Sequence, residues 1–376
     1  MGIAALRRLT GIIQKFPELR DSCSLREIAL QVHESYEGWI KRLLQPDDQE
    51  FVDEVSDALL TTVKEHVFLV GLEGLDLEDM DRLNLGLTTI CKADPALLSG
   101  IEFGGALTSE WIQSQFANKL WLIGKSQGSP EVSRQRFEHR TVLTVGILAV
   151  CGALLFKGSI WQSYVRAVTT PHQQMMAVSV LSWEAGGANP NVSRSWGQDK
   201  KLPLNAEAVS YLRRECFLDR LAELLGLEER TELQDAIVRA LYWFADAHAD
   251  RNTTMRFIKL WSCAECFFAI TDQDVTEANA RGIATILTFA GYGIATAGDY
   301  AKFKRRLKAL YDLRSRAVHR AQFGEVQLED LEEFSRSIAW LIVSMTALTE
   351  RGYRTLDAIR EQIVRLDGIV GKETVE

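Results

Sequence analysis

Residues 302–320 read KFKRRLKALYDLRSRAVHR, a stretch that combines a helical spacing of apolar residues with a dense positive charge. At about 100° per residue, Leu307, Leu310 and Tyr311 fall on one side of a helix. Arg314 falls in the middle of that apolar side, where a charge is costly unless it is paired or lines a site. The stretch therefore predicts an amphipathic helix with one cation on its buried face.

A charge of opposite sign lies on the apolar side of another predicted helix, which reads FIKLWSCAECF over 257–267. Glu265 falls about 40° from Trp261 on the helical projection, among apolar side chains. Two interpretations follow: Arg314 and Glu265 form a structural ion pair, or they line a polar pocket.

Helical periodicity extends over the whole of 207–367, because apolar residues recur there every three or four positions. The stripes are Leu233, Ile237, Leu241 and Phe244; Phe257, Ile258, Trp261, Ala264 and Phe268; Phe303, Leu307, Leu310 and Ala317; and Leu331, Phe334, Ile338, Leu341 and Met345. This pattern predicts a C-terminal helical domain.

Residues 1–66 are also predicted to be helical, as a packing or dimerisation cap. Ser24 and Glu27 have the spacing of a capping box before an apolar run. Pro46 breaks the chain, and apolar residues then repeat at helical spacing at Phe51, Val55, Leu59 and Val63.

The segment 67–206 has a mixed α/β pattern. A long helix is predicted over 130–156, with Pro130 just inside its first turn, and Asn205 is predicted to cap the next helix. Short apolar runs predict strands at 67–70, 120–123, 176–183, 192–196 and 202–204, with a turn at 186–190. The expected fold is α+β and predominantly α, in three segments divided at 66/67 and 206/207.

The composition fits an ordinary folded chain: of 376 residues, 47% are hydrophobic and 25% are charged. The net charge of −8 excludes a globally basic nucleic-acid binder, and six scattered cysteines indicate a reducing, cytoplasmic setting. No secretory signal is expected at the N-terminus. The apolar run over 141–156 is shorter than a membrane span of about 18–20 residues, so a buried helix and no membrane association are predicted.

Two short motifs resemble catalytic or metal sites but lack the required context. Residues 124–128, GKSQG, lack the first glycine of a P-loop, since Lys119 stands at that position. They also match the G-x-S-x-G motif of serine hydrolases around Ser126. In that motif the helix begins at the serine, whereas here Ser129-Pro130 delays the helix. A hydrolase that uses Ser126 stays as a rival hypothesis. Cys263-x-x-Cys266 has no second pair and is interpreted as two buried side chains, and no H-E-x-x-H occurs.

The positive charge of the stretch 302–320 has two interpretations: a helix face exposed to solvent, or a surface that binds a phosphate backbone. Eight basic residues and one acid, Asp312, give it a charge of +7. His319 follows Arg314 by five residues, or about 140° around a helix. The two side chains therefore meet only if the helix ends between them, or if two chains place their copies together across a two-fold axis. Phe323-Gly324 is a plausible helix stop.

Residues 310–319, LYDLRSRAVH, resemble the R-x4-H motif of HEPN ribonuclease domains, closest to the ApeA-like branch with its Y-x-L-R-S-[KR]-x-x-H helix. The helices ALYWF at 240–244 and FIKLWSCAECF at 257–267 resemble the A-L-x-W-[FY] and F-x-x-L-W-x-A-x-E helices of that branch, and Glu265 matches its glutamate. The resemblance covers about 210–350 well, 67–206 weakly and 1–66 hardly at all.

The resemblance implies a HEPN-type bundle, and an endoribonuclease that acts without a metal or cofactor. His319 would transfer protons, because imidazole titrates near neutral pH, and Arg314 would hold the scissile phosphate. Ser315 would donate to a phosphate oxygen and Glu265 would orient the catalytic pair. RNA-backbone contacts are expected from Lys304, Arg305, Lys308, Tyr311, Arg316 and Arg320.

The resemblance also implies an anti-phage abortive-infection effector or toxin that cleaves cellular or phage RNA. Its partners would be RNA and a second copy in a homodimer or higher homo-oligomer. Residues 1–206 would receive a phage-derived trigger or a regulatory partner. The alternative is a HEPN domain without catalysis, used for dimerisation or for binding RNA or a nucleotide.

Overall fold

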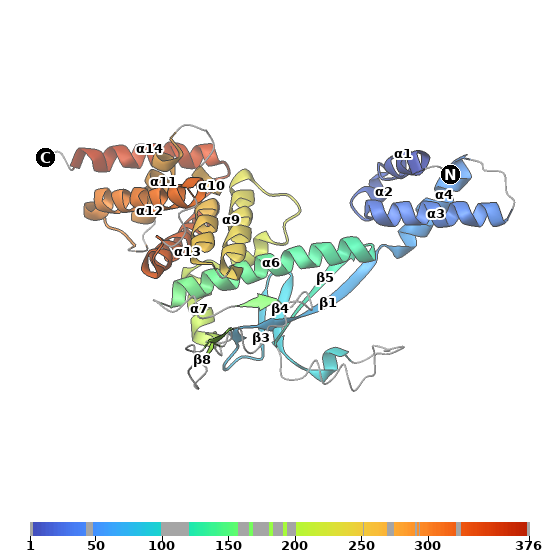
Figure 1. Cartoon of the computed structure of the whole chain (residues 1–376), viewed down its shortest axis with the longest axis horizontal. Coiled ribbons are helices and arrows are strands. Elements are labelled where there is room, and N and C mark those ends of the chain that lie inside the picture. The colour runs from blue at the N-terminus through green and yellow to red at the C-terminus, as the bar shows by residue number, and fades with distance from the viewer. Residues whose placement is uncertain are drawn as a thin grey trace. The chain divides into compact units, whose positions relative to one another are not determined.

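The computed structural model shown in Figure 1 describes most of the chain. The described residues are 3–42, 48–98, 120–156, 165–167, 180–182, 191–193, 201–250, 252–268, 274–289, 292, 294–320 and 325–373. They form mostly helices with a smaller amount of sheet, which confirms the predicted α+β, predominantly α fold class.

The chain divides into two compact units that interleave along the sequence. One unit combines Met1–Val70 with Ile123–Thr141, and the other combines Gly71–Leu122 with Val142–Glu376. This division differs from the expected boundaries after 66 and 206. Strands β1 (Lys64–Glu73) and β5 (Leu120–Gly128) and helix α6 (Pro130–Leu155) each contribute residues to both units.

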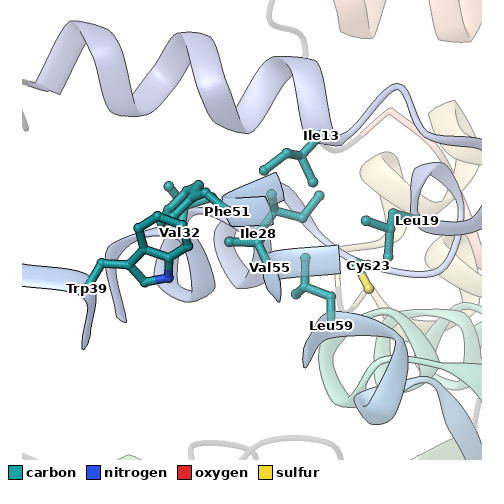
Figure 2. Packing of buried hydrophobic residues seen from close by; sticks show 9 residues of the cluster. All are labelled: Ile13, Leu19, Cys23, Ile28, Val32, Trp39, Phe51, Val55 and Leu59. Atoms are coloured by element: carbon teal, nitrogen blue, oxygen red, sulfur yellow. The ribbon is translucent and has the colours of Figure 1, made fainter. Parts of the chain in front are cut away.

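The N-terminal unit is built on four helices: α1 (Ile3–Ile13), α2 (Pro17–Arg20), α3 (Leu25–Lys41) and α4 (Asp48–Thr62). Their apolar faces form one buried cluster, in which Trp39 packs edge-on against Phe51 with ring centroids 5.4 Å apart (Figure 2). The predicted stripe on α4 is confirmed, since Phe51, Val55 and Leu59 are buried. Val63 packs at the edge of the cluster.

The capping box at the start of α3 is also confirmed, and it extends to α6. The Ser24 Oγ accepts a hydrogen bond from the Glu27 N–H, and the Ser24 N–H donates to the Glu27 carboxylate. The same carboxylate accepts the Ser129 hydroxyl and the Glu131 N–H. Although burial opposes ionisation, these hydrogen bonds outweigh it and lower the pKa of Glu27.

A five-stranded sheet has the order β3-β4-β5-β1-β6, with β3 at Arg82–Leu85, β4 at Thr88–Lys92 and β6 at Arg166–Ala167. The strands predicted at 67–70 and 120–123 lie within the longer β1 and β5. The β3–β4 hairpin was not predicted. Its two-residue loop begins at Gly86, whose φ of +58° favours glycine.

Two strand pairs complete the described sheet structure. β2 (Leu75–Asp76) pairs in parallel with β9 (Leu202–Pro203), which confirms a strand at 202–204. β7 (Val180–Ser182) pairs antiparallel with β8 (Asn191–Ser193). β7 lies within the strand predicted at 176–183, and β8 overlaps the strand predicted at 192–196 but begins one residue earlier. The rest of those two predicted strands, and the turn at 186–190, lie outside the described residues.

The second unit contains the predicted C-terminal helices, of which α9 to α14 lie together in Figure 1 (yellow to red). They are α7 (Ala206–Glu215), α8 (Leu218–Leu224), α9 (Glu232–Ala249), α10 (Thr253–Phe268), α11 (Val275–Phe289), α12 (Tyr300–Arg320), α13 (Leu328–Glu350) and α14 (Leu356–Glu373). The residues of the four predicted stripes are buried, except Ile258 and Phe303, which are partly buried. Asn205 caps α7 as predicted, since its side chain accepts the Ala208 N–H.

Helix α10 lies at the centre of this group, because it contacts α9, α11, α12, α13 and α14. Its aromatic residues Phe257 and Trp261 are fully buried and pack against Phe334 of α13, with ring centroids 5.4 and 4.2 Å apart. The polar residues of α10 are accordingly all buried or partly buried.

Helix α6 is the one described helix long and apolar enough to cross a membrane, and 67% of that apolar window is buried within the protein. Its second half packs against α9 so closely that a Cβ at Gly146 would lie 2.6 Å from the Leu241 carbonyl oxygen. The burial confirms the prediction of a core helix in the apolar run 141–156.

Gly146→Ala is expected to lower the free energy of unfolding by about 1–3 kcal/mol, because the added methyl group must push α6 away from the α9 backbone. Gly368→Ala in α14 is the matched control, since its Cβ would meet nothing within 4 Å. That control should be neutral or stabilising by up to about 1 kcal/mol. Urea unfolding followed by circular dichroism measures both, and equal effects would contradict close packing at Gly146.

Candidate functional site

The centre of the candidate site is an ion pair between α12 and α10. An Arg314 Nη2 atom lies 3.0 Å from Glu265 Oε1, and the two side chains are only 18% and 21% exposed. The Tyr311 hydroxyl donates to the same carboxylate at 3.4 Å. The structure thus brings together three of the predicted site residues and confirms that the two charges on apolar helix faces are paired.

Aromatic rings hold this pair in place. The Arg314 guanidinium lies 5.4 Å from the centroid of the Tyr311 ring, within the range of a cation–π contact. Tyr311 in turn packs edge-on against Trp261, with centroids 4.9 Å apart. Through Tyr311 and Trp261, the pair is therefore in contact with the buried core of the helical group.

Burial dominates the electrostatics of the pair. Loss of solvent raises the pKa of Glu265, although the nearby Arg314 charge and the Tyr311 hydrogen bond oppose that rise. Burial likewise raises the pKa of Tyr311. The Arg314 Nε atom is buried and has no hydrogen-bond partner within the described structure, so this guanidinium keeps a donor that is not used by Glu265.

His319 lies apart from this pair. Helix α12 continues through Arg320, so it does not end between Arg314 and His319. Arg314 faces Glu265, whereas His319 is exposed. Of the two arrangements that could bring them together, only the one with two chains is compatible with this helix. The proposed stop at Phe323-Gly324 lies outside the described residues.

Ser315 is partly buried one residue beyond Arg314. In the described part of the chain, the side chains of Ser315 and His319 form no hydrogen bond or ion pair. The structure therefore leaves both side chains available to another molecule.

Most other cations of α12 are occupied by carboxylates. Lys304 and Lys308 both pair with Glu277 of α11, and Lys304 also lies 3.5 Å from Asp367 of α14. Arg316 pairs with Glu325 at 2.9 Å. These carboxylates were not identified from the sequence, because their separation from α12 along the chain gives no spacing signal.

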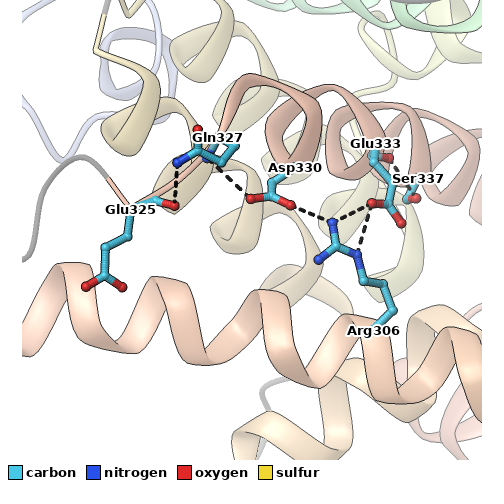
Figure 3. A network of polar contacts seen from close by, with 6 residues as sticks. All are labelled: Arg306, Glu325, Gln327, Asp330, Glu333 and Ser337. Atoms are coloured by element: carbon cyan, nitrogen blue, oxygen red, sulfur yellow. Dashed lines mark hydrogen bonds and ion pairs between the residues drawn. The ribbon is translucent and has the colours of Figure 1, made fainter.

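Arg306 of α12 is likewise paired with carboxylates of another helix. Its guanidinium bonds to Asp330 at 2.5 Å and to Glu333 at 2.7 and 3.1 Å, joining α12 to the first turns of α13 (Figure 3). Asp330 also accepts the Gln327 N–H in the cap of α13. Arg306 is therefore a structural clamp between two helices.

Three cations of the stretch stay exposed: Lys302, Arg305 and Arg320. None of them forms an ion pair with a described residue. The +7 stretch is thus not a uniform basic surface, since Lys304, Lys308 and Arg316, expected to contact RNA, have carboxylate partners.

The two short motifs, at 124–128 and at Cys263–Cys266, also lack the structural surroundings of a catalytic or metal site. Ser126 is 3% exposed inside strand β5, not at a strand-to-helix turn, so residues 124–128 form neither a nucleophile elbow nor a phosphate loop. The Cys263 and Cys266 thiols donate to backbone carbonyls within α10, and burial raises the pKa of both. No group of three or more metal-ligating side chains occurs among the residues that the structure describes.

Comparison with protein-family models, with curated protein sequences and with solved structures found no match for this chain.

A double-mutant cycle on Glu265→Gln and Arg314→Gln tests the ion pair. Either single change leaves a partly buried partner without its charge, so a coupling energy of about 0.5–3 kcal/mol is expected from chemical unfolding. The exposed Arg134–Glu138 pair of α6 is the control and should couple more weakly, because water screens it. Coupling of Glu265 and Arg314 no larger than that of the control would contradict the proposed support of Arg314.

Proposed function

We propose that this protein is a metal-independent endoribonuclease of the HEPN type that acts in the cytoplasm as an abortive-infection effector or toxin. The observation that carries the proposal is the R-x4-H helix α12, on which Arg314 is held by Glu265 while His319 stays exposed. The resemblance of α9, α10 and α12 to the ApeA-like branch supports the same assignment.

The chemistry follows from the residue types. A neutral His319 takes the proton of a ribose 2′-hydroxyl, whose oxygen bonds to the phosphorus as the bond to the 5′-oxygen breaks. A second, protonated His319 supplies the proton to that leaving oxygen. Arg314 offsets the charge that develops on the phosphate, and Ser315 donates to a phosphate oxygen. The products are a 2′,3′-cyclic phosphate and a 5′-hydroxyl.

Two copies of the chain supply the second histidine. Arg314 and His319 lie about 140° apart around one helix, so a single chain presents them in different directions. A two-fold axis that passes the end of α12 brings both copies of each residue into one groove. Exposed apolar side chains support an interface there: Val318 is 45% exposed and Leu328, at the start of α13, is 50% exposed.

The non-catalytic alternative has one observation in its favour. Arg314 is paired with Glu265, and Lys304, Lys308, Arg306 and Arg316 also have carboxylate partners. In that case the domain serves for dimerisation or binding, and RNA is retained without being cleaved. In either case residues 1–206 receive the trigger or regulatory partner.

His319→Ala and Arg314→Ala are expected to abolish cleavage of purified RNA and toxicity in bacteria, with the variants still folded. Arg314→Lys should also be inactive, because a point charge replaces a planar two-pronged donor. His33→Ala, another exposed histidine, is the control and should remain active. RNA ends mapped from cells and from reactions with EDTA provide the measurement. Full activity of His319→Ala, or loss in EDTA that magnesium restores, would refute the mechanism.

Arg305 and Arg306 offer a matched pair of neighbouring cations. Arg305→Gln should weaken RNA binding and reduce its salt dependence, because the variant loses a cation that has no carboxylate partner and can contact an RNA phosphate. Arg306→Gln should lower stability by up to about 1 kcal/mol, since the clamp is partly exposed, and should affect RNA binding less. Filter-binding titrations at several salt concentrations separate the two, and an equal loss of binding would show that only net charge matters.

Val318→Glu is expected to weaken self-association without changing Arg314 or His319. A buried carboxylate at the proposed interface has no partner, and two copies would repel each other across the axis. The sedimentation coefficient and the rate of RNA cleavage should fall together. Val364→Glu, at another exposed apolar position, should alter neither. An active monomer would overturn the requirement for two chains.

A further inference from the structure

A cavity with a volume of about 440 Å³ lies between α11, α13 and α14, beside Phe217 at the start of α8. None of Glu265, Tyr311, Arg314 and His319 lines it. The volume is within the range of sites that bind small molecules. The proposed nuclease chemistry makes no use of this cavity.

The walls of the cavity are largely apolar and aromatic. Phe217, Phe289, Tyr292 and Tyr353 line it from four different segments of the chain. The Tyr292 ring packs against Trp340 with centroids 4.6 Å apart, which fixes the orientation of this wall. Aromatic walls of this kind suit a planar apolar body.

The charges at the cavity are unbalanced. Arg351 and Arg365 both line it and are exposed, and neither guanidinium pairs with a described carboxylate. Glu350 also lines it, but its carboxylate is bound by Arg220 at 3.2 Å. Two cations therefore remain available to a ligand with an acidic group.

Three other polar side chains of the wall form hydrogen bonds within the protein. Ser344 donates to the Trp340 carbonyl, and the Thr285 hydroxyl bonds to the Tyr300 hydroxyl at 3.0 Å. The Arg365 Nε donates to Gln362 at 2.9 Å and leaves its two Nη groups free. The cavity's preference for a charged ligand thus rests on the two arginines.

The backbone at one wall is held in an unusual conformation. Phe217 has φ of 56° and ψ of 34°, in the left-handed region that L-residues rarely adopt. No side-chain cap compensates at this start of α8. Residues held in this way concentrate at ligand sites and switch regions, because the surrounding fold must enforce them.

We propose that this cavity is a binding site for a small amphipathic anion, with a planar aromatic body between the aromatic walls and one acidic group on Arg351 and Arg365. The two guanidinium groups provide charge-assisted hydrogen bonds to the acid. The site is independent of the nuclease assignment.

The probe is 1-anilinonaphthalene-8-sulfonate, compared with its neutral relative N-phenyl-1-naphthylamine in fluorescence titrations of the full chain. Saturable binding of the sulfonate at one site per chain is expected. Arg351→Gln/Arg365→Gln should weaken sulfonate binding about tenfold or more and change binding of the neutral probe less than about twofold. Arg7→Gln/Arg354→Gln, with the same change in net charge outside the cavity, should affect neither.

Ala347→Trp should weaken both probes, because the added ring fills the cavity that Ala347 lines. The arginine variants keep the test decisive if this variant does not fold. Non-saturable sulfonate binding, or an equal loss in the cavity and control arginine variants, would overturn the proposal. An unchanged affinity of Arg351→Gln/Arg365→Gln would do the same.

Discussion

The enclosure of α10 by five other helices constrains every charge that the helix carries. Arg256 is 3% exposed and donates to the backbone carbonyls of His248 and Asp250. Lys259 pairs with Asp246 and Asp250, and Glu265 pairs with Arg314. Because an unpaired charge inside a bundle is costly, the positions of α9 and α12 are tied to these contacts. The geometry of Arg314 is one consequence of packing around α10.

The same enclosure explains what could be predicted from the sequence. Apolar stripes such as Leu233–Ile237–Leu241 report directly on which helix faces are buried, so the helices of 207–367 were predicted well. Arg314 and Glu265 each lie on the apolar face of a predicted helix. Because a buried charge needs a partner, these positions indicated that the two residues could pair. The β3–β4 hairpin was missed because its strands are short and its Gly86–Leu87 turn has no typical asparagine or aspartate signal.

Contacts between distant segments had no sequence signal. The partners of Lys304, Arg306 and Lys308 come from α11, α13 and α14, and nothing in their spacing relates them to α12. His248 is a further example: its Nε2 accepts the Val165 N–H, and burial lowers its pKa to about 3. A formal charge count of 302–320 therefore describes the chain, whereas the charge that a ligand meets is set by tertiary structure.

The interleaved order of the two units has a consequence for biosynthesis. The N-terminal unit includes Ile123–Thr141, so its first 70 residues leave the ribosome well before the segment that completes it. At about 5–20 residues per second, the 71 residues from 71 to 141 require roughly 4–14 s. During that interval the Glu27 carboxylate lacks Ser129 and Glu131, and the contacts available to α1–α4 are those within the four helices, such as the apolar cluster and the Trp39–Glu54 hydrogen bond. The nascent chain thus passes through a stage in which its first helices are made but not yet joined to α6.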